Sequence, residues 1–125
     1  MTTRMELAPT PAGRKPAATP RRWRRLVAEQ PGVARGYEAL RAACDAAGPL
    51  EPGVIALVKL AVSVGARDGR TTHIHTKKAL AAGVAPEALR QVAFVAMPTI
   101  GLPAALDALD WIDESLLEAR AADPL

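Results

Sequence analysis

Proline and glycine divide this chain into segments of helical length, and this punctuation constrains the fold more than any other feature of the sequence. Both residues commonly end helices, proline because it lacks an N–H and glycine because it accepts a left-handed turn. The segments between them show helical apolar spacing, and none has the strict alternation of a strand. Aromatic residues make up only 3% of the chain, and abundant alanine and leucine favour helix. The sequence therefore predicts an all-α fold, with helices over about residues 21–30, 33–47, 53–64, 68–82, 86–97 and 103–119.

Three of these segments carry more specific expectations. The segment 53–64 is apolar on nearly all sides, so we expect it to be the central buried helix, ending at Gly65. Pro98 is expected to break or kink the fifth helix, leaving residues 99–103 as a loop. The last helix is expected to turn one apolar stripe inward, made of Leu102, Leu106, Leu109, Ile112 and Leu116.

The positive charge is concentrated at the N-terminus. Residues 1–25 hold seven basic side chains and one acidic one, whereas the remaining hundred hold nine basic and twelve acidic. Residues 1–20 also lack periodicity, so we expect a disordered basic tail over 1–20 and one helical domain over 21–125. Arginine clusters bind nucleic acid or anionic lipid in other proteins. The tail has no groove-reading motif, so we expect a solvated extension and no nucleic-acid partner.

We expect neither a membrane span nor secretion. No stretch of about 18 apolar residues is present, so we expect no membrane span. The charged N-terminus lacks an apolar core, and the single cysteine, Cys44, cannot form an internal disulfide. A cytoplasmic protein is the expectation, with Cys44 buried in the alanine-rich helix around it.

Both histidines lie in one stretch, "GRTTHIHTKKALAAG", residues 69–83. On a helix His73 and His75 point about 200° apart, to nearly opposite sides. Two helical histidines that chelate one ion usually stand four residues apart, so we expect no metal and no cofactor here. The pair would be usable only if residues 70–75 were extended, or if a second subunit contributed ligands.

His75 is the stronger candidate for chemistry because its face of the helix carries small and hydroxylic residues. Thr71 precedes it by one turn, within hydrogen-bonding reach, while Asp68 lies two turns away. His73 is nearer to Arg70 and Lys77 on the wheel, a more solvent-like face. The alternative for His75 is a half-buried structural histidine, or one at a subunit interface.

Lys59 is the only charge in the apolar segment 53–64. A lysine in this position reaches solvent along its aliphatic stem, or it faces a pocket and attracts an anionic ligand. The sequence leaves both alternatives open.

The order of these segments resembles the carboxymuconolactone decarboxylase-like family, which includes the alkylhydroperoxidase AhpD proteins. The resemblance covers about residues 33–117. It is most specific in the spacing from His75 through Ala79 and Leu80 to Gly83, then in Pro86-Glu87 and in "GLPAA" at 101–105. It implies an all-helical, AhpD-like bundle with a helical hairpin, assembled as a homo-oligomer. A trimer or hexamer is expected.

The residues that the resemblance aligns match this family only in part. The redox branch carries a CxxCxxxH motif and a preceding glutamate, and these cysteine and glutamate positions fall on Asp68, Thr71 and Ala56. A peroxidase without a thiolate has no nucleophile, so we expect no peroxidase activity. The decarboxylase branch has a glutamate near Thr71. Only its histidine is matched, by His75, which the family places in a pocket at the subunit interface.

The sequence thus points to a cysteine-free member that binds or transforms a small acidic organic compound. His75 is expected to be the general acid or base, with Thr71 orienting it. Lys59 and Lys78 are expected to hold a carboxylate, and Asp68 is a further candidate ligand-binding residue. The alternative is a non-catalytic ligand-binding or scaffold member of the family.

Overall fold

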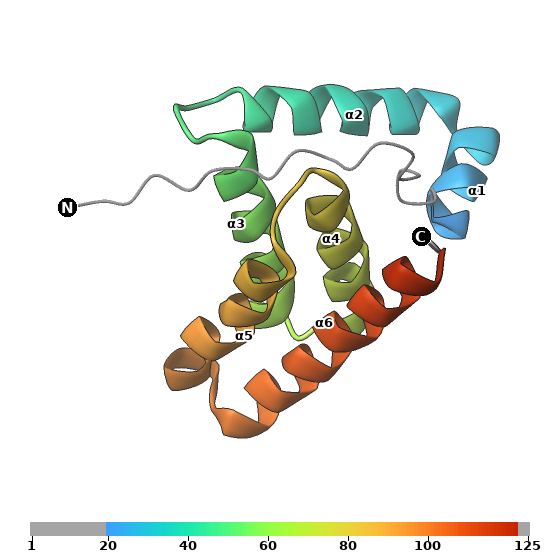
Figure 1. Ribbon diagram of the computed structural model, residues 1–125. Coiled ribbons are helices and arrows are strands. Elements are labelled where there is room, and N and C mark those ends of the chain that lie inside the picture. Colours follow the sequence, from blue (N-terminus) through green and yellow to red (C-terminus); the bar gives the residue numbers. More distant parts are fainter. Residues whose placement is uncertain (1–19, 123–125) are drawn as a thin grey trace. The chain divides into compact units, whose positions relative to one another are not determined.

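The computed structural model describes residues 20–122, and these form helices without a strand (Figure 1). The expected all-α fold is therefore confirmed. The helices are α1 (Arg21–Glu29), α2 (Pro31–Asp45), α3 (Pro52–Gly65), α4 (Gly69–Ala81), α5 (Pro86–Ile100) and α6 (Leu102–Ala122). The expected basic tail over residues 1–20 lies, except for its last residue, outside the described part of the chain.

The helices fall into two compact units, which divide at Pro52. In the first, α1 and α2 are separated only by Gln30, and the rings of Trp23 and Tyr37 pack with centroids 5.5 Å apart. Ala34 is the only buried residue of these two helices. Cys44 is exposed on α2, contrary to expectation, because this helix buries almost none of its surface.

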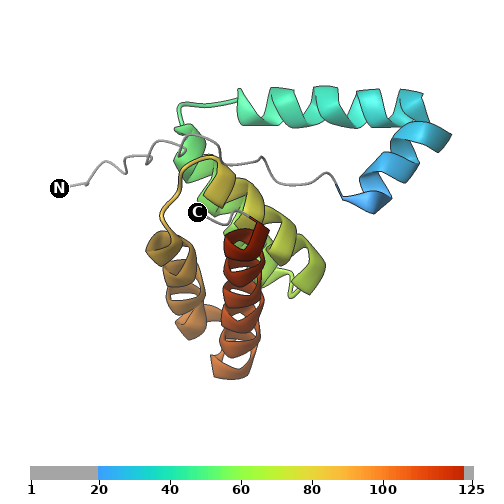
Figure 2. The same cartoon turned by 45° about the vertical axis from the view of Figure 1, so that its right-hand side comes forward.

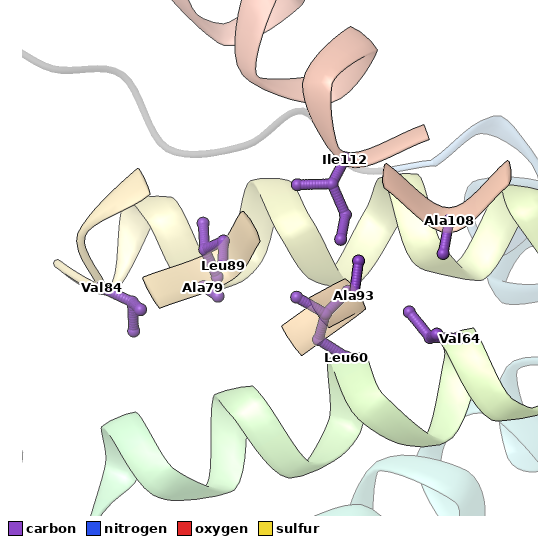
Figure 3. Packing of buried hydrophobic residues seen from close by; sticks show 8 residues of the cluster. All are labelled: Leu60, Val64, Ala79, Val84, Leu89, Ala93, Ala108 and Ile112. Atoms are coloured by element: carbon purple, nitrogen blue, oxygen red, sulfur yellow. The ribbon is translucent and has the colours of Figure 1, made fainter. Parts of the chain in front are cut away.

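The second unit is a four-helix bundle of α3 to α6. α3 packs against α4 and α5, and α6 packs against both of these helices as well. α5 and α6 lie side by side in both views (Figure 1, Figure 2). Buried side chains from all four helices and the α4–α5 connection meet in one core (Figure 3), namely Leu60, Val64, Ala79, Val84, Leu89, Ala93, Ala108 and Ile112.

Three hydroxyl groups inside this bundle each donate to the backbone carbonyl four residues earlier. Thr72 donates to the carbonyl of Asp68 at 2.8 Å, and Thr76 donates to that of Thr72 at 2.7 Å. Ser63 donates in the same way to Lys59 at 3.0 Å. Because each hydroxyl has an acceptor, burying these small side chains carries little desolvation cost. Their small size lets α4 approach its neighbours closely.

α4 is capped at both ends. Asp68 caps its N-terminus by accepting a hydrogen bond from the backbone N–H of Thr71. At the other end Gly83 has a φ of 97°, and the N–H of Val84 bonds to the carbonyl of Ala79. This Schellman arrangement requires a left-handed residue, so the expected end of the helix at Gly83 is confirmed.

Three expectations about the helices are wrong, the third of them only in part. α5 continues through Pro98 to Ile100, and the proline lies in the last turn of the helix. The expected loop is reduced to Gly101, with a φ of 93°, which separates α5 from α6. α3 is buried on one side only, since Val58 and Val62 are exposed. The inward face of α6 matches the expected stripe only in part, because Leu102 and Leu106 are exposed, whereas Ile112 is buried and Leu109 and Leu116 pack against the core. The buried residues of that face are Ala104, Ala105, Ala108, Ile112 and Ser115.

No helix in residues 20–122 is long and apolar enough to cross a membrane.

Gly69 should be intolerant of a side chain because α6 approaches the start of α4 there. A Cβ at Gly69 would lie 2.9 Å from Cε2 of Trp111, closer than real Cβ contacts, and the rigid indole cannot yield easily. We expect Gly69→Ala to lower the free energy of unfolding by about 1–3 kcal/mol, as measured by urea denaturation. Gly65→Ala is the control, because a Cβ there meets nothing within 4 Å. Equal stability of the two variants would contradict this packing.

Candidate functional site

α4 carries both histidines, and it packs against α3 and α6. The helix places the two rings on nearly opposite sides, as the 200° separation requires. His75 feels the charge of Lys59 on α3, whereas His73 is hydrogen-bonded to α6. In the described residues no group of three His, Cys, Asp or Glu side chains is placed to hold a metal ion.

His75 is half-buried, and the charges of two lysines act on its ring. Burial is the largest cause that lowers the pKa of His75 below its ordinary value of 6.5, followed by the charges of Lys78 and Lys59. No hydrogen bond to its ring is found within residues 20–122. The ring is therefore uncharged at neutral pH, so it has a lone pair available to accept a proton.

The two lysines come from different helices. Lys59 is half-buried on α3, and Lys78 is exposed in the last turn of α4. The charges of both lysines act on the same imidazole, and both lower its pKa. The structure therefore brings together three of the residues singled out in the sequence: His75, Lys59 and Lys78.

Asp68 and Thr71 are bonded to each other at the start of α4. The carboxylate of Asp68 accepts the 3.2 Å hydrogen bond from Thr71 N, and hydrogen bonding from Thr71 is the main cause that lowers the pKa of Asp68. In the described part of the chain, Thr71 makes no hydrogen bond to His75. These two residues form the N-terminal cap of the helix that carries His75.

His73 does not lie on a solvent-like face, contrary to the expectation from the wheel. Its side chain is only 25% exposed. Nδ1 lies 2.7 Å from Oγ of Ser115, and Nε2 lies 3.2 Å from Oε2 of Glu114. One turn further on, Lys77 of α4 pairs with Glu118 of α6. The wheel gives the angle between two side chains, but it cannot show that α6 covers the second face.

The group of Ser115, His73 and Glu114 looks superficially like a hydrolytic triad. However, Ser115 is 1% exposed, and its hydroxyl also lies 2.8 Å from the carbonyl of Trp111. A nucleophile must reach the substrate, and this hydroxyl cannot. The arrangement therefore joins two helices and does not form a catalytic triad.

An open hollow of about 330 Å³ lies in the α1–α2 unit, lined by Trp23, Val27, Pro31, Ala34, Arg35 and Glu38. None of these residues belongs to the histidine site.

The lowered pKa of His75 predicts how stability should depend on pH. Above about pH 6.5 the imidazole is neutral in both the folded and the unfolded chain. As the pH falls below that value, the unfolded chain takes up the proton first, so the free energy of unfolding decreases. The decrease levels off once the pH is below the pKa of His75 in the folded chain. Urea denaturation of the wild type and His75→Gln should therefore show an extra loss of stability on acidification in the wild type. Parallel pH curves for the two proteins would contradict the burial of His75.

Comparison with known proteins gives one match. The family model described as "Carboxymuconolactone decarboxylase family" matches residues 31–114, which run from the start of α2 into α6. No curated protein and no solved structure matches. The matched region covers more than half of the chain and includes α3 to α5 with the histidine helix. The chain therefore belongs to the carboxymuconolactone decarboxylase family.

Proposed function

We propose that this family member binds a small acidic organic compound at His75 and transforms it by non-redox proton transfer. A lactone or a β-keto-type acid has the required chemistry. The observation that carries the proposal is a half-buried imidazole whose pKa is lowered by burial and by the charges of Lys78 and Lys59. Burial and the two ammonium groups together favour the neutral imidazole, and the ammonium groups also attract the carboxylate of a ligand.

Each residue has a distinct role in the proposed chemistry. Lys59 and Lys78 bind the carboxylate and orient the ligand. His75 takes a proton from an acidic C–H or O–H of that ligand, and then returns it to the product. Either proton abstraction beside a carbonyl or loss of carbon dioxide leaves enolate charge. A nearby ammonium stabilises this charge more in the transition state than in the ground state.

The residues do not support redox chemistry at this position. The places where the redox branch of the family carries cysteines hold Asp68 and Thr71, which form the cap of α4. Cys44 lies on α2, in the other compact unit. A peroxidase label would therefore describe relatives rather than the residues of this chain.

The alternative is a non-catalytic member that binds a ligand or acts as a scaffold. It is favoured by the absence of catalytic residues at three positions where relatives of the redox branch carry them. In this chain these positions hold Ala56, Asp68 and Thr71. In that case His75 and the lysines would still bind an acid, but the acid would not be consumed.

We also propose that the protein works as a homo-oligomer, with a trimer or hexamer expected. The bundle leaves large apolar side chains exposed on three helices: Val58, Val62, Phe94, Val95, Leu102, Leu106 and Leu117. Exposed apolar surface of this kind is usual where subunits meet.

The carboxylate-binding role can be tested with paired charge variants. Small carboxylic acids, lactones and β-keto acids would be screened by thermal shift and the affinity of any hit measured by calorimetry. We expect Lys59→Gln and Lys78→Gln each to weaken binding about 10-fold or more, as expected when a charge-assisted contact is lost. Arg70→Gln is the matched control, because it removes a positive charge from an exposed position on the same helix.

The same screen separates catalysis from binding. Consumption of the ligand, followed by NMR and abolished in His75→Ala, is the result expected of an enzyme. Binding without consumption would favour the non-catalytic alternative. The proposed site would be wrong if Arg70→Gln weakened binding as much as the two lysine variants.

A further inference from the structure

We propose that His73 is a positioning residue, whose ring fixes the rotation of α4 and so holds His75 toward α3. The proposal concerns the rotation of α4. That this rotation matters for chemistry rests on the function proposed above. The family resemblance assigns no role to this histidine.

The first support is the way the ring of His73 is held on both sides. Both contacts come from neighbouring residues of α6: Glu114 binds Nε2, and Ser115 binds Nδ1. The Ser115 hydroxyl is itself buried and tied to the carbonyl of Trp111. Ser115 therefore forms a rigid anchor on α6, and any rotation of α4 about its axis would break both contacts of the ring.

The second support is a parallel contact one turn further along. Lys77 follows His73 by four residues, and its partner Glu118 follows Glu114 by four residues. Residues four apart lie on one face of a helix. The two pairs therefore form successive cross-links along one seam, which fixes the register of α4 on α6 as well as its rotation.

The hydrogen bonds of His73 can be satisfied in either protonation state. With a neutral ring, Nε2–H donates to Glu114 and the Ser115 hydroxyl donates to Nδ1. With a protonated ring, Nδ1–H donates to Ser115, whose own proton turns to the carbonyl of Trp111. A hydroxyl both donates and accepts, and so allows this exchange. The cross-link is therefore kept when the ring gains a proton.

The position of the His75 ring depends on the rotation of α4, because the ring has no hydrogen bond of its own in the described residues. The charged groups that act on His75 are Lys78 on its own helix and Lys59 on α3. A rotation of α4 would change both the burial of the ring and its distance from Lys59.

The test is an NMR titration of the His75 ring in the full chain without ligand. In Ser115→Ala and in His73→Ala, we expect the midpoint of His75 to rise toward the ordinary value of 6.5, because the ring becomes less buried. Ser115→Ala is nearly the same size as the wild-type residue, so it should fold even if His73→Ala does not. Glu114→Ala should raise the midpoint as well, and Glu114→Gln should restore it in part, because the amide still offers an acceptor oxygen.

Two controls separate positioning from a general loss of stability. Ile112→Val removes one methyl from the core on the same helix, so it should lower the melting temperature without moving the midpoint of His75. Asp110→Ala removes an exposed carboxylate from α6 and should change neither. The proposal is overturned if the midpoint stays at the wild-type value in a folded Ser115→Ala, or if Ile112→Val moves it equally. Because no ligand is used, a shifted midpoint upholds the positioning role even if the acid-binding function fails.

Discussion

Close packing of α4 against both α3 and α6 is the constraint on which the histidine site depends. Thr72, Thr76 and Ala79 are buried on this helix, and all three are small. The threonine hydroxyls donate to carbonyls of the preceding turn, so they enter the interior with their hydrogen bonds made. A helix held on two sides has two buried flanks, and one histidine lies on each of them.

This placement gives two chemically identical side chains different roles. The ring of His73 is bonded at both nitrogens to α6, and it acts through its geometry. The ring of His75 has no such bonds in residues 20–122, and its pKa is lowered by burial and by two lysines. An unbonded, uncharged imidazole near cations is the group suited to exchange a proton with an acidic ligand. Structural support and the proposed chemistry are thus carried by one helix, two residues apart.

The helices and the position of His75 could be predicted from the sequence because both depend on local rules. Gly83 ends α4 because the turn requires a left-handed residue, and this holds whatever packs around it. The inward face of α6 was partly misjudged, because leucine is more apolar than alanine. In the bundle Ala105 and Ala108 face inward, where only small residues allow close approach, which displaces the buried face by about a quarter turn. Pro98 was misjudged because a proline in the last turn of a helix leaves few later bonds to break.

The role of His73 could not be predicted, because its partners lie about forty residues further along the chain. Nothing in the local pattern shows that Ser115 and Glu114 will face it. Similarly, the spacing of Thr71 from His75 did not indicate that Thr71 bonds to Asp68 and so caps the helix. Polar side chains near the start of a helix commonly accept hydrogen bonds from the backbone N–H groups there, because these groups have no partner within the helix.

The central claim is that His73 is hydrogen-bonded through both ring nitrogens, whereas His75 is not. It is tested most directly by NMR correlation of the ring ¹H and ¹⁵N nuclei of both histidines at neutral pH. A ring N–H that is bonded and shielded exchanges slowly with water, and an unbonded one exchanges too fast to be seen. The account predicts a persistent Nε2–H signal for His73, lost in Glu114→Ala, and no such signal for His75. A protected ring proton on His75, with none on His73, would contradict the arrangement of α4 described above.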